Sequence, residues 1–151
     1  YLCRAKIYHL QFSETQRHLL LTVHGLSNKS ISAFLTDKYL ICVWNIWQPS
    51  SPQNILMCES EVKCCCFSPG RASLVFAGTV DGSVLVWDLR EDFNMHQSLT
   101  IEDVNWTFRS VTFSTDGVFS YVNHTHPVKS IEPVPTVEAK EHGISALSSE
   151  G

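Results

Sequence analysis

The sequence predicts an all-β chain made of about two and a half four-stranded antiparallel units. Two internal repeats carry this prediction. The stretch Val43-Trp44-Asn45-Ile46 recurs 43 residues later as Val86-Trp87-Asp88-Leu89. The stretch Cys66-Phe67-Ser68-Pro69 recurs 46 residues later as Thr112-Phe113-Ser114-Thr115. Short apolar runs bounded by polar turn residues fill the intervals, and such runs are typical of β-strands.

The second unit is the clearest. Its first strand is predicted from Val62 to Phe67, where the turn Ser68-Pro69-Gly70 ends an apolar run. Leu74 to Thr79 is the next strand. Asp81-Gly82 then predicts a tight hairpin, because glycine accepts the positive φ that primed turns require.

The remaining strands follow from the same pattern. Ser83 to Leu89 is predicted to return beside the second strand, and His96 to Ile101 is predicted as the outer strand of this unit. In the first unit, the polar stretch Gly25 to Asp37 precedes a strand from Tyr39 to Trp44. A third unit is predicted to begin with a strand from Arg109 to Phe113.

The chain divides into four segments on this basis. Residues 1–58 form the first unit, 59–104 the second, 105–127 the start of a third, and 128–151 an irregular or truncated tail. A further strand from Val118 to Val122 is possible in the third unit. After it, Pro127, Pro133 and Pro135 are expected to interrupt any strand, because proline lacks the donor that a β-ladder needs.

Composition excludes several classes of function. The 151 residues are 44% hydrophobic and 17% charged, which is the balance of a globular protein and not of a disordered one. The net charge of −4 disfavours nucleic acid and anionic membranes as partners. No apolar run reaches the length of about 18 residues needed to span a bilayer. No phosphate-binding glycine loop is present, so we predict no cofactor and no small-molecule substrate.

The cysteines and histidines offer weaker alternatives. Cys64, Cys65 and Cys66 are consecutive, so in a strand Cys65 faces away from the other two, and the three cannot share one zinc ion. We expect buried, reduced thiols. His124 and His126 could form half of a metal site, and the pair His24 and Ser27 could suggest a base and a nucleophile. Neither has the further partners that metal binding or catalysis needs, so no catalytic or metal site is predicted.

The repeat resembles the WD40 family, whose blades of about 40–45 residues contain four short strands. The resemblance rests on Phe-Ser-Pro at 67–69 and on Ala-Gly-Thr-Val-Asp-Gly-Ser-Val-Leu-Val-Trp-Asp-Leu at 77–89. Such blades often carry a hydrogen-bonded set of Asp, His, Ser or Thr, and Trp, but Ala77 stands where the Ser or Thr is expected. The resemblance therefore implies a partial β-propeller with an incomplete network. Its structural blade residues are Trp44, Phe67, Asp81, Gly82, Trp87 and Phe113.

A finer resemblance covers residues 8–135. The stretches His-Leu-Leu-Leu-Thr-Val-His-Gly at 18–25, Ile-Cys-Val-Trp-Asn-Ile-Trp-Gln-Pro at 41–49 and Cys-Cys-Cys-Phe-Ser-Pro at 64–69 are similar to dynein intermediate chains. The order of motifs after residue 74 is most similar to the cytoplasmic dynein 2 type, the motor of intraflagellar transport. Since a closed propeller needs at least four blades, the chain resembles a fragment of such a subunit.

The resemblance implies a non-catalytic adaptor. Its propeller would bind the dynein heavy chain, and light-chain sites would lie in an N-terminal extension outside these residues. The expected location is the cytoplasm and the cilium, including the ciliary base and the microtubule cytoskeleton, where the motor supports retrograde transport and cilium assembly.

Loops on a rigid scaffold are the usual contact points for large partners. The candidate protein-binding residues are Trp47, Gln48, Arg90, Glu91 and Asp92. The alternative is a WD40 recognition module of another kind, such as a ubiquitin-ligase substrate receptor. Receptors of phosphorylated motifs use clustered arginines, and the five arginines here are dispersed, which disfavours that alternative.

Overall fold

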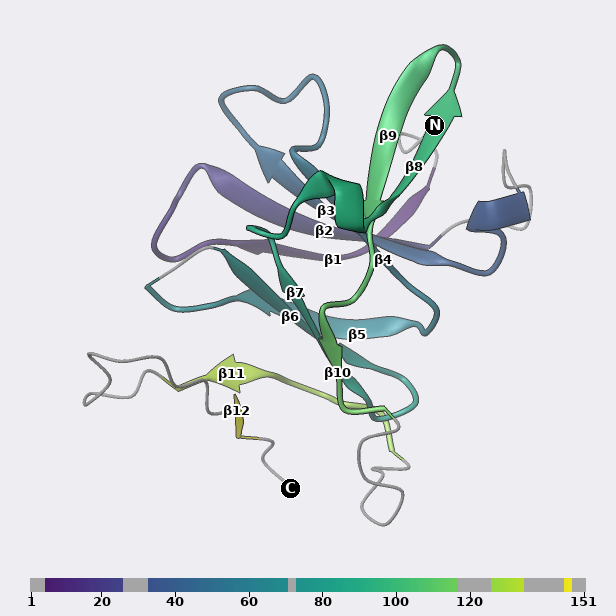
Figure 1. Cartoon of the computed structure of the whole chain (residues 1–151). Helices are drawn as coiled ribbons and strands as arrows, with labels where there is room; N and C mark the ends of the chain where they lie inside the picture. The colour runs from purple at the N-terminus through teal and green to yellow at the C-terminus, as the bar shows by residue number, and fades with distance from the viewer. Residues whose placement is uncertain (1–4, 26–32, 71–72, 117–125, 135–145, 148–151) are drawn as a thin grey trace.

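The computed structural model describes residues 5–25, 33–70, 73–116, 126–134 and 146–147. These residues form a six-stranded sheet, a four-stranded sheet and a two-stranded ladder, and the two larger sheets are stacked (Figure 1). Helical structure in the described part is limited to short 3₁₀ turns, among them η2 (Ala33–Leu35) and η3 (Phe93–Met95). The prediction of an all-β chain is confirmed, and the stacked sheets are consistent with a partial WD40 propeller.

The first sheet begins as a four-stranded antiparallel meander and is then extended. Its strand order is β1-β2-β3-β4-β9-β8. All neighbours are antiparallel except β4 and β9, which pair in parallel at Ile55 with Phe108 and at Leu56 with Arg109. The strands are β1 (Lys6–Phe12), β2 (Leu19–Gly25), β3 (Tyr39–Asn45), β4 (Asn54–Cys58), β8 (Gln97–Ile101) and β9 (Val104–Arg109).

The second sheet has the order β10-β7-β6-β5. Its members are β5 (Val62–Phe67), β6 (Leu74–Thr79), β7 (Val84–Asp88) and β10 (Phe113–Ser114). The first two match the predicted bounds, and the third lies within the predicted Ser83 to Leu89. The predicted hairpin is confirmed, since Gly82 has a φ of +89° and the Ser83 amide donates to the Asp81 carboxylate at 3.1 Å.

The prediction for the outer strand of the second unit was wrong. Residues 97–101 form β8, which pairs with β9 in the first sheet, and the fourth strand of the second sheet is β10. The third unit was expected to open with a strand from Arg109 to Phe113, but β9 ends at Arg109 and Phe113 pairs with Val86 of β7.

Threonine hydroxyls stabilise β10 as the fourth strand of the second sheet. Thr112 and Thr115 flank this strand, and their hydroxyls accept hydrogen bonds from the Asp88 and Val84 amides, each at 2.9 Å. The amides of both threonines also donate to β7 carbonyls, so polar groups at this sheet edge are paired. In the sequence the β8–β9 hairpin thus lies between β7 and β10, although these two strands are neighbours in the second sheet. It also crosses the predicted boundary at residue 104.

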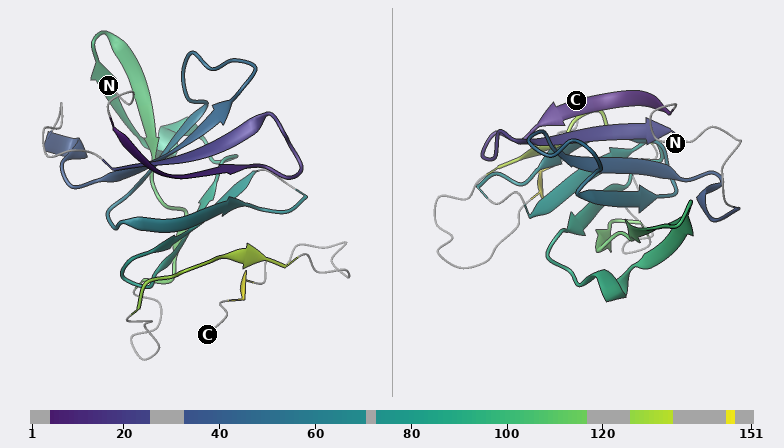
Figure 2. Two further views of the ribbon diagram at one scale, coloured as in Figure 1. Left: turned by 180° about the vertical axis from the view of Figure 1, so that it is seen from behind. Right: turned by 90° about the horizontal axis from the view of Figure 1, so that it is seen from above.

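The main core lies between the two large sheets. One apolar cluster joins Leu21, Ile41 and Leu56 of the first sheet to Val75 and Trp87 of the second. A separate cluster lies on the opposite face of the first sheet, where η2 and the β8–β9 hairpin cover it with Leu35, Phe34, Leu99, Ile101 and Trp106. Figure 2 shows the stacked arrangement from behind and from above. Leu99, Ile101 and Trp106 are partly buried against this cluster, which favours the pairing of the hairpin with β4.

The two repeated tryptophans have equivalent places but different partners. Trp44 lies opposite Leu20 in β2, and its indole N–H donates to the Thr22 hydroxyl at 2.7 Å. That hydroxyl also lies 2.7 Å from Nε2 of His24, so a Trp–Thr–His chain crosses the first sheet. This chain was not predicted.

In the second sheet the corresponding series of side-chain hydrogen bonds is incomplete. Trp87 lies opposite Val75, which gives Ala77 the place of Thr22. The buried Nε1 of Trp87 has no hydrogen-bond partner in the part of the chain that the structure describes. The incomplete network implied by Ala77 is therefore present, and packing holds this indole in place.

Ala77→Thr is expected to be more stable than Ala77→Val, because its hydroxyl takes the place from which Thr22 accepts the indole N–H of Trp44 in the first sheet. The gain is about 1 kcal/mol relative to Ala77→Val, which has the same shape without the acceptor. Pulse proteolysis of the full-length protein in a urea series measures the difference. Equal midpoints for the two variants would contradict the assignment of Ala77 to the Thr22 place.

A short strand also forms where prolines were expected to prevent one. β11 (Glu132–Pro133) pairs with β12 (Ala146–Leu147). Proline retains its carbonyl acceptor and a φ compatible with an extended edge strand, so a two-residue ladder accommodates it. Val128 precedes this ladder and its amide donates to the Thr79 carbonyl at 3.0 Å, which holds the segment against the second sheet. Residues 117–125, including the predicted strand Val118 to Val122, and Pro135 lie outside the described residues.

The described cysteines are buried free thiols, as predicted. Cys65 packs in the core between the sheets, whereas the Cys64 thiol contacts the Val128 carbonyl on the other face. Burial raises the pKa of Cys42 to about 12, and mainly burial raises that of Cys65 to about 12, so both remain protonated at neutral pH. Cys3, His124 and Ser27 lie outside the described residues.

Candidate protein-interaction site

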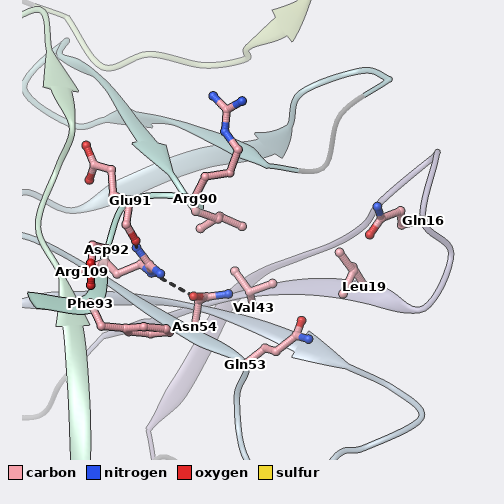
Figure 3. Close-up of a pocket in the computed structure, with 11 residues that line it drawn as sticks. Gln16, Leu19, Val43, Gln53, Asn54, Arg90, Glu91, Asp92, Phe93 and Arg109 are labelled. Carbon is pink, nitrogen blue, oxygen red and sulfur yellow. Dashed lines mark hydrogen bonds between the residues drawn. The ribbon is translucent and has the colours of Figure 1, made fainter. Parts of the chain in front are cut away.

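A hollow of about 620 Å³ lies beside the ends of both large sheets (Figure 3). Loop β1–β2 and strands β2, β3 and β4 form one side. The segment that follows β7 and the end of β9 form the other. The lining residues are Gln16, Leu19, Val43, Gln53, Asn54, Leu89, Arg90, Glu91, Asp92, Phe93 and Arg109. Three of the five predicted partner-binding residues therefore meet in one hollow.

The other two predicted residues lie outside the hollow, in loop β3–β4. Trp47 is 74% exposed, and its ring stacks on His18 with centroids 4.3 Å apart. The Gln48 amide donates to the Asn45 carbonyl at 2.9 Å, and the Trp47 amide donates to the Asn45 side chain at 3.0 Å. A tight turn thus holds the indole at the surface.

Local contacts fix the three predicted residues that line the hollow, which are Arg90, Glu91 and Asp92. Arg90 forms a two-point ion pair with Asp88, with Nε to Oδ1 at 2.9 Å and Nη2 to Oδ2 at 2.7 Å. The Arg90 guanidinium lowers the pKa of Asp88, although partial burial opposes this. Asp92 begins η3, and its side chain accepts from the Asn94 amide at 3.1 Å. A Glu91 carboxylate oxygen lies 3.4 Å from Nε2 of His96.

Arg109 is a buried cation at the wall of the hollow, with 3% of its surface exposed. Its Nε donates to the Asn54 side-chain oxygen at 2.9 Å, shown in Figure 3, and its Nη1 donates to the Glu91 carbonyl at 2.9 Å. The guanidinium also lies 4.7 Å from the centroid of the Phe93 ring. This one side chain thereby links β9 to β4 and to the segment after β7.

His96 packs beside this guanidinium. Its Nδ1 accepts from the Ser110 amide at 3.2 Å, so the neutral ring carries its proton on Nε2. That nitrogen lies 3.1 Å from Nη1 of Arg109 as well as near Glu91. Burial and the charge of Arg109 lower the pKa of His96, and the carboxylates of Glu91 and Asp92 only partly oppose this.

Sequence comparison assigns the chain to a family. A model described as the dynein axonemal intermediate chain 3 WD40 domain matches residues 25–125. The chain belongs to the dynein intermediate-chain WD40 family. The recognition made from the motifs is confirmed, and the stacked sheets are WD-repeat blades.

Named relatives agree with this assignment. The chain is 52% identical over 144 residues to cytoplasmic dynein 2 intermediate chain 1 of Homo sapiens, covering 95% of this chain. It is 50% identical over 139 residues to the Mus musculus protein, covering 92% of this chain. The chain is 27% identical over 113 residues to the cytoplasmic dynein 1 intermediate chain of Drosophila melanogaster, covering 74% of this chain. The chain spans 14% of the length of each of these relatives.

Sequence reasoning missed several residues in and beside the hollow. Arg109, Phe93, His96 and Asn54 were not singled out. Arg109 gave a usable signal, because an arginine next to the buried Phe108 at the end of an apolar strand needs local acceptors. The described residues contain no group of three or more metal-ligating side chains and no helix long and apolar enough to span a membrane.

The stability of the protein is expected to fall in mild acid, because of His24 in the first sheet and His96 beside the hollow. Burial lowers the pKa of His24, and burial and Arg109 lower that of His96, whereas in the unfolded chain both titrate near 6.5. Above pH 6.5 both states are neutral and the full stability is present. As pH falls through 6.5, the unfolded chain binds protons first, and stability is lost until the pH reaches the lower folded pKa.

Urea midpoints of the full-length protein at intervals from pH 7.5 to 5 measure this effect. Each histidine adds a slope of at most about 1.4 kcal/mol per pH unit. His24→Gln and His96→Gln should each flatten the pH dependence, even if each also lowers stability at pH 7.5. An unchanged slope in both variants would show that other groups cause the effect.

Proposed function

We propose that this chain is part of a non-catalytic scaffold subunit of cytoplasmic dynein 2 that binds the dynein heavy chain. The observation that carries the proposal is 52% identity over 144 residues to a protein named cytoplasmic dynein 2 intermediate chain 1. Through that motor the subunit supports retrograde intraciliary transport and cilium assembly. It acts in the cytoplasm and cilium, including the ciliary base, and its light-chain sites lie outside these residues.

The exposed end of the first sheet supports protein binding. Trp47 is 74% exposed, and Phe12 and Ile46 at the same end of the sheet are 51% and 44% exposed. Tryptophan is enriched among the residues that contribute most to binding at protein interfaces. The stack with His18 and the turn at Asn45 hold the indole in place, so little side-chain entropy is lost when a partner covers it.

Affinity purification of the full-length protein from ciliated cells tests the proposal. Dynein heavy chain and light chains in constant proportion are the expected result. Cullin or other ubiquitin-ligase subunits without dynein would overturn it and favour a different WD40 recognition role.

Trp47→Ala is expected to lower recovery of the heavy chain in this purification by about fivefold or more, because loss of an interface tryptophan commonly costs about 1 kcal/mol or more. Val104→Ala is the matched control, since Val104 is an exposed apolar residue at the tip of the β8–β9 hairpin. Equal heavy-chain recovery with both variants would show that Trp47 lies outside the interface.

A further inference from the structure

We infer that a further β-blade of the same polypeptide, outside residues 1–151, packs on one face of the first sheet. This open face carries apolar side chains of β1, β2 and the end of β3, which are Leu10, Phe12, Leu20, Trp44 and Ile46. The occupant is a β-sheet that presents an apolar face of its own. The inference goes beyond the proposed scaffold function, because this contact forms whichever partner the subunit binds.

The two large sheets correspond residue by residue at this face. In the first sheet, Leu20 of β2 lies opposite Trp44 of β3 and Phe12 of β1. In the second sheet, Val75 of β6 lies opposite Trp87 of β7 and the phenylalanine that ends β5. The corresponding pairs are Leu10 and Cys65, Phe12 and Phe67, Leu20 and Val75, Trp44 and Trp87, and Ile46 and Leu89.

The second sheet shows what covers this face when a neighbouring blade is present. Val75 and Trp87 are fully buried and Phe67 is 7% exposed, and all three belong to the cluster that packs on the first sheet. The residues that the first sheet contributes, such as Leu21 and Val43, lie on its opposite face. One blade contact therefore joins a tryptophan face to the opposite face of the neighbouring blade.

Propellers repeat one blade contact around a central axis. The same contact, applied to the first sheet, places the opposite face of another blade on Trp44 and Phe12. The relatives are long enough to supply such a blade, since this chain spans 14% of their length.

The open face lacks this cover within the described part of the chain. Leu10 is 53% exposed and Phe12 is 51% exposed, although the corresponding residues of the second sheet are buried. η2 and the β8–β9 hairpin cover only the part of this face around Leu40, Cys42 and Ile55 of β3 and β4. Clustered exposed apolar side chains of this kind mark a contact surface.

The same correspondence leaves Trp47 outside the blade contact. Trp47 follows Ile46 as Arg90 follows Leu89, and the Arg90 side chain is 63% exposed although the first sheet packs beside the second. The new blade would therefore cover Phe12 and Ile46, whereas Trp47 in loop β3–β4 would stay accessible to a partner protein.

A pair of aspartate variants in the purified full-length protein tests the inference. Phe12 and Val104 are 51% and 50% exposed in this structure, so without a further blade the two changes should have similar effects. Phe12→Asp is expected to raise the unfolded fraction about tenfold or more at a fixed urea concentration, because the blade would bury a carboxylate that has no partner. Val104→Asp, at the tip of the β8–β9 hairpin, should change it less than about twofold. Pulse proteolysis measures both fractions, and equal effects would overturn the inference.

Photo-crosslinking identifies the occupant. Leu10 is replaced by p-benzoyl-phenylalanine in the full-length protein in ciliated cells, and crosslinked peptides are identified by mass spectrometry. The expected product has the mass of one chain and joins Leu10 to a segment outside residues 1–151 with alternating apolar residues. The same replacement at Val104 is the control and should not reach that segment.

Three crosslinking results would overturn the inference. They are products that contain another protein, products with the mass of two copies of this chain, and products confined to residues 1–151. Failure of the proposed function would look different, because dynein heavy chain would be absent from the purification while the Leu10 crosslink within the chain remained.

Discussion

Trp87→Ala is expected to lower the free energy of unfolding by about 3–5 kcal/mol, the usual cost of deleting a large buried aromatic side chain. Trp87 is fully buried between the two large sheets and packs in the cluster that holds them together. Its removal leaves a cavity at the contact between the blades, and the surrounding β-sheets cannot collapse to fill it.

Conservative variants separate packing from hydrogen bonding at the two repeated tryptophans. Trp87→Phe loses part of the ring but no hydrogen bond, because the indole N–H has no partner among the described residues. Trp44→Phe also loses the bond to Thr22 and leaves that hydroxyl with one partner fewer. Pulse proteolysis in urea measures all three variants in the full-length protein. If Trp87→Ala shifts the midpoint no more than Trp87→Phe, the core assignment is wrong.

Arg109→Ala is expected to be the second most damaging change, at about 2–4 kcal/mol. It leaves the Asn54 oxygen and the Glu91 carbonyl without their donor and removes the cation beside Phe93. Arg109→Lys should recover only part of the loss, since one ammonium group does not reproduce two N–H directions from a planar fork.

Arg90→Ala is the matched control for this experiment. Arg90 lines the same hollow, but its side chain is 63% exposed, so its ion pair with the half-buried Asp88 contributes little to stability. Urea midpoints of the full-length protein should therefore fall for Arg109→Ala and remain close to wild type for Arg90→Ala. Similar shifts for the two variants would argue against a structural role specific to Arg109.

Local sequence signals predicted the second sheet well. The strands from Val62 to Phe67 and from Leu74 to Thr79 lie between strong turn signals, and Asp81-Gly82 fixes the hairpin, so neighbours in sequence are neighbours in the sheet. The Phe-Ser repeat also located Phe113 at a strand. It did not reveal the sheet, because β10 pairs with β7 across the inserted hairpin.

Local sequence signals could not predict which strands and side chains distant in the sequence meet. The parallel pairing of β4 with β9 depends on where Trp106 and Phe108 are buried, and periodicity within one segment does not specify the partner of an edge strand. The hollow itself was not predicted; Arg90, Glu91 and Asp92 were named only as loop residues after a strand, and their role in partner binding stays a prediction. Arg109 belongs to it only because three segments distant in sequence meet there.

The parallel contact between β4 and β9 has a consequence for synthesis. The first sheet is complete only after the ribosome has delivered residue 109, by which time all of β5, β6 and β7 has been made. Non-local parallel pairing forms slowly, so β4 presents an open edge during that interval. Completion of the first sheet therefore waits for two strands that follow the whole β5–β7 meander in the chain.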